Sequence, residues 1–170
     1  MMEKIEELTP DDIEMSLEVA TDKDKIAELI INNKPDLSNN NVFNLIVFAI
    51  NKYEIAKLII NKKPELSSNN VESLLLAAQD TPLQADVMAI AYLIIEKKPE
   101  LSNEDIKNLF NKATDKEKIA EAIINKTPNL SDDNVSTLLN LVNNKYEIAK
   151  LIIKKKPELS DKDVYSFLYQ

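Results

Sequence analysis

The sequence predicts an all-α fold: a right-handed α-solenoid of about five antiparallel helix pairs, followed by a half-unit at the C-terminal end. The first observation is that the segment at residues 51–67, NKYEIAKLIINKKPELS, returns at residues 144–160 with a single difference, Asn61 against Lys154. Three weaker copies begin at Lys25, Ile90 and Lys118. The second is that every copy is an apolar run at helical spacing that a proline stops. A two-helix unit of this size cannot bury its apolar faces alone, so neighbouring units must stack.

Each unit opens with a leucine that Ser or Thr follows. The opening leucines are Leu8, Leu37, Leu66, Leu101, Leu130 and Leu159, at spacings of 29, 29, 35, 29 and 29 residues. The hydroxyl residue is expected to be the N-cap of the unit's first helix, as Thr9, Ser38, Ser67, Ser102, Ser131 and Ser160. The leucine and a later Ile or Val have the spacing of a hydrophobic staple. We therefore expect residues 1–170 to form a single helical-repeat domain.

The two helices of a unit can be followed in order along the second unit. Its first helix carries an apolar stripe at Val42, Leu45, Ile46 and Ala49. The expected N-caps of the second helices are Asp22, Asn51, Asp80, Asp115 and Asn144. The second helix is expected to bury Ile55, Ala56, Leu58, Ile59 and Ile60, with counterparts Ile148, Ala149, Leu151, Ile152 and Ile153 in the fifth unit. The second helices should end before Pro35, Pro64, Pro99, Pro128 and Pro157.

Three features depart from a plain array. The third unit carries six extra residues around Asp80–Ala85, where Thr81-Pro82 is expected to cap a second helix more than one turn longer than the others. Units one and two match units four and five at an offset of 93 residues, which indicates that a three-unit block was duplicated. The sequence ends at Gln170, within the first helix of a sixth unit. This last helix either folds back as a cap or belongs to a longer array.

The residue types present exclude most catalytic chemistry. The chain has no histidine, cysteine or glycine, so it can form neither a Ser-His-Asp triad, a Cys- or His-based metal site, nor a glycine-rich phosphate loop. Paired carboxylates occur at Asp11-Asp12, Glu104-Asp105 and Asp132-Asp133. Each pair lies in the expected first turn of a helix, where acids offset the helix dipole. We therefore predict a protein that is not an enzyme and needs no cofactor or metal.

The charged residues leave two interpretations open. The net charge is −8, which disfavours a nucleic-acid or anionic-membrane partner. Seventeen of the 21 basic residues, all lysines, nevertheless fall in or beside the second helices. If they formed a stripe they would bind an anionic partner, and the candidate anion contacts are Lys52, Lys57, Lys145 and Lys150. Alternatively, such lysines complement the negative C-terminal ends of helices.

Apolar and aromatic residues outside the stripes are candidates for contact with a partner. Phe43 and Val47 lie one turn apart off the stripe of their helix, and Leu76 is their neighbour in the next unit. Leu83 and Val87 belong to the expected extension in the third unit, and Tyr53 and Tyr146 lie on the outer side of second helices. The alternative for all of them is wider packing or cover of the core.

The unit pattern, L-[ST]-x-x-x-V followed by I-A-x-L-I-I-x-K-K-P-E, resembles HEAT-type repeats and leucine-rich-repeat variants. This resemblance spans nearly the whole chain and implies a curved scaffold that binds other macromolecules. Residues 8–13, LTPDDI, are similar to the repeat opening of transcription-activator-like effectors, and the lysine and proline at the helix exit are similar to mitochondrial termination-factor repeats. The effectors use paired glycines in the interhelix loop to approach DNA, and this chain has none.

These observations predict a non-catalytic scaffold that binds another protein or peptide through the side of the second helices and the longer third unit. The alternatives are nucleic-acid binding through lysine ladders and a structural spacer within a longer array. One continuous lysine face would favour nucleic acid, whereas alternating charge would favour a protein partner. The N-terminal residues MMEKIEELTP lack the apolar core of a signal peptide, and no apolar run is long enough to span a membrane. We expect a cytoplasmic protein, with non-classical export left open, and the sequence predicts no oligomeric state.

Overall fold

The computed structural model describes residues 8–34, 36–63, 65–79, 84–98, 100–127 and 129–159. These residues form ten helices and no strand. The helices are α1 (Pro10–Val19), α2 (Lys23–Asn33), α3 (Asn39–Phe48), α4 (Lys52–Lys62), α5 (Ser68–Gln79), α6 (Gln84–Lys97), α7 (Asn103–Lys112), α8 (Lys116–Lys126), α9 (Asp132–Leu141) and α10 (Lys145–Lys155). The half-unit expected from Ser160 onward lies outside the described residues.

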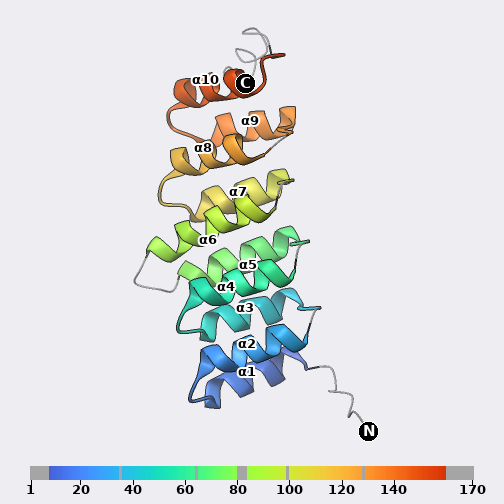
Figure 1. Cartoon of the computed structure of the whole chain (residues 1–170). Coiled ribbons are helices and arrows are strands. Elements are labelled where there is room, and N and C mark those ends of the chain that lie inside the picture. The colour runs from blue at the N-terminus through green and yellow to red at the C-terminus, as the bar shows by residue number, and fades with distance from the viewer. Residues whose placement is uncertain are drawn as a thin grey trace.

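The helices stack in two layers, as the sequence predicts for an all-α solenoid. Each odd-numbered helix packs against the next odd-numbered helix, from α1 to α9, and each even-numbered helix against the next even-numbered one, from α2 to α10. The two helices of each unit also contact one another. The result is an elongated stack with α1 and α10 at opposite ends (Figure 1). Equivalent residues of successive units therefore lie side by side on the same face.

The capping pattern is confirmed wherever the described residues allow a test. The side chains of Thr9, Ser38, Ser102 and Ser131 accept from the third backbone N–H of their helices. Ser67 does the same, because its Oγ lies 3.1 Å from the N of Asn70. Asp22, Asn51, Asp115 and Asn144 cap the second helices, whereas Asp80 lies outside the described residues. No described residue has a positive φ, so the turns of these units need no glycine.

The core is the stripe that the sequence predicts, with one correction. Val42, Leu45 and Ile46 are fully buried, and so is the alanine of the second helices at Ala27, Ala56, Ala91 and Ala120. The prediction that Leu58, Leu151 and Ile153 are buried is wrong, because all three are half-buried. The two leucines line open spaces between neighbouring second helices. Ile153 lies in α10, the last helix of the described stack.

Polar ties between the ends of the helices hold each unit in register. In the first three units, the lysine before the proline donates to the carbonyl oxygen of the opening leucine of its own unit: Lys34 to Leu8, Lys63 to Leu37 at 2.6 Å and Lys98 to Leu66 at 2.6 Å. In the fifth unit Lys156 binds Asp132 instead, at 3.0 Å. In α5 and α9, the side chain of the third residue donates a hydrogen bond to the preceding unit. The Nδ2 of Asn70 donates to Asn39 at 2.7 Å and that of Asn134 to Asn103 at 3.0 Å.

Asp105 holds the same position in α7 that Asn70 and Asn134 hold in α5 and α9, but it carries a charge. Its side chain is fully buried, and its Oδ2 accepts from the N of Ser102 at 2.8 Å and from the Nζ of Lys98 at 2.9 Å. Burial alone would raise the pKa of Asp105, but the ammonium of Lys98 and the N–H and hydroxyl of Ser102 together hold this pKa below its usual value. The carboxylate is thus kept ionised inside the stack.

Both helices of the third unit are longer than their counterparts, and α5 has 12 residues against 10 for each of the other first helices. Helix α6 has 14 residues, against 11 for each of the other second helices. The described extension of three residues is slightly less than one turn of helix. The sequence predicts more than one turn, and Thr81-Pro82, which would begin it, lies outside the described residues.

The buried alanine of the second helices should tolerate no larger side chain. Ala56→Leu is expected to lower the free energy of unfolding by about 1–3 kcal/mol, because it inserts three carbon atoms into a filled core. Ala122→Leu is the matched control, since Ala122 is only half-buried and the equivalent residue is leucine in the four other units. Urea unfolding of both variants measures the difference. Equal stability of Ala56→Leu and the parent would contradict close packing at this position.

The buried carboxylate predicts a pH dependence with a definite sign. The pKa of Asp105 in the folded chain lies below its unfolded value of about 3.9, so its stabilisation is present above that pH and is lost as the pH falls through the folded pKa. Asp105→Asn should therefore lower the free energy of unfolding by about 1–3 kcal/mol at neutral pH, and the difference from the parent should shrink below about pH 4. Urea unfolding across this range tests it, with the exposed Asp133→Asn as control. A difference that does not change with pH would show that ionisation is irrelevant.

Candidate functional site

The exposed side of the second helices carries charges of alternating sign. We call this surface, on α2, α4, α6, α8 and α10, the second-helix face. The third residues of these helices and their equivalents form one row: Lys25, Glu54, Ala89, Lys118 and Glu147. One turn on, the second row is Glu28, Lys57, Tyr92, Glu121 and Lys150. Because neighbouring second helices pack side by side, both rows alternate in sign along the stack, interrupted only by the third unit.

Several of these charges are paired within their own helix. Lys57 Nζ lies 3.3 Å from Glu54 Oε2 and 5.9 Å from the centre of the Tyr53 ring. Lys150 Nζ lies 3.2 Å from Glu147 Oε1 and 4.3 Å from the centre of the Tyr146 ring, and the hydrogen bond that Lys150 donates to Glu147 raises the pKa of Lys150. Because these pairs are exposed, solvent screens their attraction and they contribute little to stability. A partner could therefore exchange them for its own charges at little cost.

Two grooves open on the second-helix face, each between the second helices of adjacent units. The groove between α2 and α4 has a volume of about 290 Å³ and is lined by Glu28, Asn32, Glu54, Lys57, Leu58 and Asn61. The groove between α8 and α10 has a volume of about 480 Å³ and is lined by Glu117, Glu121, Asn144, Glu147, Ile148, Lys150, Leu151 and Lys154. In both, a half-buried leucine lies among acidic and basic side chains.

The four candidate anion contacts have different surroundings. Lys52 is 7% exposed, and its Nζ donates to the carbonyl oxygen of Ala77 at 2.8 Å, at the C-terminal end of α5. Lys57 and Lys150 form the pairs described above, and Lys145 is half-buried. Since Lys34, Lys63 and Lys98 also bind backbone carbonyl groups, the lysines do not form one uncovered stripe. Lys52 complements the C-terminal end of α5, whereas the other three bind the residues that precede the N-caps of first helices.

The candidate partner contacts divide between the two faces of the stack. Phe43 is 38% exposed on α3, with Val47 and Leu76 half-buried on α3 and the adjacent α5. Tyr53 is half-buried and Tyr146 is 65% exposed on the second-helix face. Val87 is only 4% exposed, because it takes the place that Lys52 has in the second unit, against the core. Leu83 lies outside the described residues.

Sequence reasoning missed several exposed apolar residues. They are Met15, Val19, Leu29, Ile50 and Tyr92. Ile50 and Val19 are the most exposed, at 76% and 84%. A signal was available for Ile50, because the matching position of the interhelix turn holds Thr21, Gln79, Thr114 or Asn143 in the other units. The pattern of buried positions alone could not separate them from core residues.

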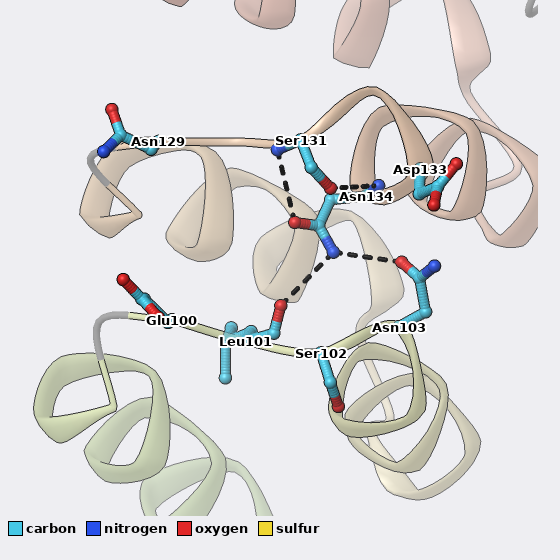
Figure 2. A pocket seen from close by; sticks show the side chains of 8 residues that line it. All are labelled: Glu100, Leu101, Ser102, Asn103, Asn129, Ser131, Asp133 and Asn134. Carbon is cyan, nitrogen blue, oxygen red and sulfur yellow. Dashed lines mark hydrogen bonds between the residues drawn. The ribbon is translucent and has the colours of Figure 1, made fainter.

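A third hollow, of about 340 Å³, lies between the segments that enter α7 and α9. Figure 2 shows that the amide of Asn134 bridges it. Its Nδ2 donates to the carbonyl oxygen of Leu101 at 3.3 Å and to Asn103 at 3.0 Å, while its Oδ1 accepts from the N of Ser131. Because the buried polar atoms of Asn134 are engaged in holding two units together, we interpret this hollow as structural.

The lysine before the proline should be structural where it binds the opening leucine. Lys63→Met is expected to lower the free energy of unfolding by about 1–3 kcal/mol, because it removes a charged hydrogen bond to the carbonyl oxygen of Leu37. The neighbouring Lys62→Met, at an exposed position of α4, should change it by less than about 0.5 kcal/mol. Thermal and urea unfolding compare the two variants. Equal effects would mean that Lys63 is only a surface charge.

Among the described residues, no helix is long and apolar enough to cross a membrane, and no three side chains of the metal-binding types gather into a cluster. The comparisons with known proteins yield no match for the chain among family models, curated proteins or solved structures. The described residues have a repeat-like all-α fold.

Proposed function

We propose that this protein is a non-catalytic scaffold that binds another protein through the second-helix face. The observation that carries the proposal is the alternating sign of the exposed charges along that face. An interface with both signs in fixed register selects a partner with the complementary pattern and repels others. The resemblance to HEAT-type repeats, scaffolds for other macromolecules, supports the same function.

The composition of the face also suits a protein partner. Tyr92 is 39% exposed and Tyr146 65% exposed, and tyrosine is enriched where proteins meet. Leu58 and Leu151 offer partly covered apolar surface between the charges. Nucleic-acid binding has weaker support, because the net charge is −8 and many lysines are already engaged by carboxylates or backbone carbonyl groups.

The proposal predicts that charge reversal on the second-helix face releases the partner. A nuclease-treated extract of the cells that make the protein is passed over the immobilised chain, and retained proteins are identified by mass spectrometry. Glu28→Lys with Glu121→Lys should lose the retained protein, because both carboxylates are exposed on this face. Glu14→Lys with Glu72→Lys, exposed on the first helices, should retain it.

A titration with labelled nucleic acid provides the complementary test. At about 50 mM salt, where electrostatic binding is least screened, duplex DNA and single-stranded RNA should bind more weakly than about 100 μM. Affinity in the micromolar range that falls steeply with salt would contradict the proposal, as would loss of the retained protein only in the first-helix variant.

A further inference from the structure

The two grooves on the second-helix face are copies of one another. Every residue that lines the α2/α4 groove has its equivalent 93 residues later, at or beside the α8/α10 groove. Five of the six pairs are identical in residue type: Glu28 and Glu121, Asn32 and Asn125, Glu54 and Glu147, Lys57 and Lys150, and Leu58 and Leu151. The grooves differ at the position of Asn61, where Lys154 lines the second groove.

The contacts that shape the two grooves are duplicated as well. Glu54 and Glu147 each bind the lysine three residues on, at 3.3 and 3.2 Å. Asp24 Oδ1 accepts from the N of Ile50 at 2.8 Å, and Glu117 Oε1 accepts from the N of Asn143 at 3.0 Å. In each case an acid of one unit fixes the interhelix turn of the next. The duplication has therefore kept a three-dimensional arrangement, in addition to a sequence pattern.

Each groove keeps one acid that forms no hydrogen bond or ion pair with the described residues. These acids are Glu28 and Glu121, and both are exposed. The cation nearest in sequence to Glu121 is Lys118, which is bound to Asp115 at 2.8 Å and whose pKa the charge of Glu121 helps to raise. A carboxylate without an ion-pair partner attracts a basic side chain, and the half-buried leucine on the opposite wall offers apolar contact. This chemistry fits a segment with a basic and an apolar side chain.

The third unit separates the two copies. Ala89 and Tyr92 stand where the grooves have a glutamate and a lysine, so the matched set of residues does not recur there. The spacing of the grooves is thus three units. At about 8–10 Å between packed helices, this places them roughly 25–30 Å apart.

We infer that the second-helix face holds two equivalent peptide sites, which bind a partner carrying the same basic and apolar segment twice. This inference rests on the proposed function and adds its stoichiometry and the chemistry of the segment. Each segment places its basic side chain against Glu28 or Glu121 and its apolar side chain against Leu58 or Leu151. When both segments belong to one partner, the second binding event is intramolecular and affinity rises by about 10²–10⁴-fold.

The test begins with peptides selected by phage display against the whole chain. The selected peptide is synthesised in single form and as a tandem joined by roughly 30 Gly/Ser residues, which span this distance as a flexible coil. Calorimetry should find two single peptides per chain, and the tandem should bind about 10²–10⁴-fold more tightly. Glu28→Lys and Glu121→Lys should each reduce the count to one, and together they should abolish binding.

The controls separate failure of this inference from failure of the proposed function. Glu14→Lys should leave both the count and the affinity unchanged, and thermal melts verify that each variant is folded. A count of one, lost in only one of the two groove variants, would overturn the duplicated site while leaving the second-helix face as a binding surface. Binding that neither variant weakens, or a selection that yields no binding peptide, would overturn both.

Discussion

The structure depends on one constraint: a pair of helices of 10 to 14 residues cannot bury its own apolar faces. Each pair must therefore lie against the next, and the fully buried alanine of the second helices sets how closely they approach. Since successive units stack in the same register, the equivalent positions of these units form a row along one face. A surface of repeated rows is what allows alternating charges and duplicated grooves to form.

The polar residues divide into two groups that serve this arrangement differently. One group binds backbone at the ends of the helices, as Lys63 does at Leu37 and Asn134 at Leu101. These contacts satisfy backbone carbonyl groups of the residues that directly precede the N-caps of first helices. The other group, on the second-helix face, is bound weakly within its own helix or not at all. Only the contacts of the second group could be replaced by contacts with a partner without a large loss of folding stability.

Much of the fold follows from local pattern, and most of the site does not. The caps at Ser38 and Asn51 and the stripe from Val42 were predictable because their partners lie within one or two turns. The burial of Lys52 was not, because its acceptor is Ala77, 25 residues away in the next unit. The sequence pattern wrongly predicts that Leu58 is buried, because its exposure depends on a contact between units, the spacing of α2 and α4. The rows of alternating charge became visible only once the second helices were seen packed side by side.

The central claim is that a protein partner covers the second-helix face. Carbodiimide labelling of surface carboxylates, read by mass spectrometry with and without the bound partner, tests it most directly. Labelling of Glu28 and Glu121 should fall in the complex, while labelling of Glu14 and Glu72, exposed on the first helices, should stay constant. Protection of Glu14 and Glu72 alone would place the partner on the opposite face, over Phe43, and contradict the account.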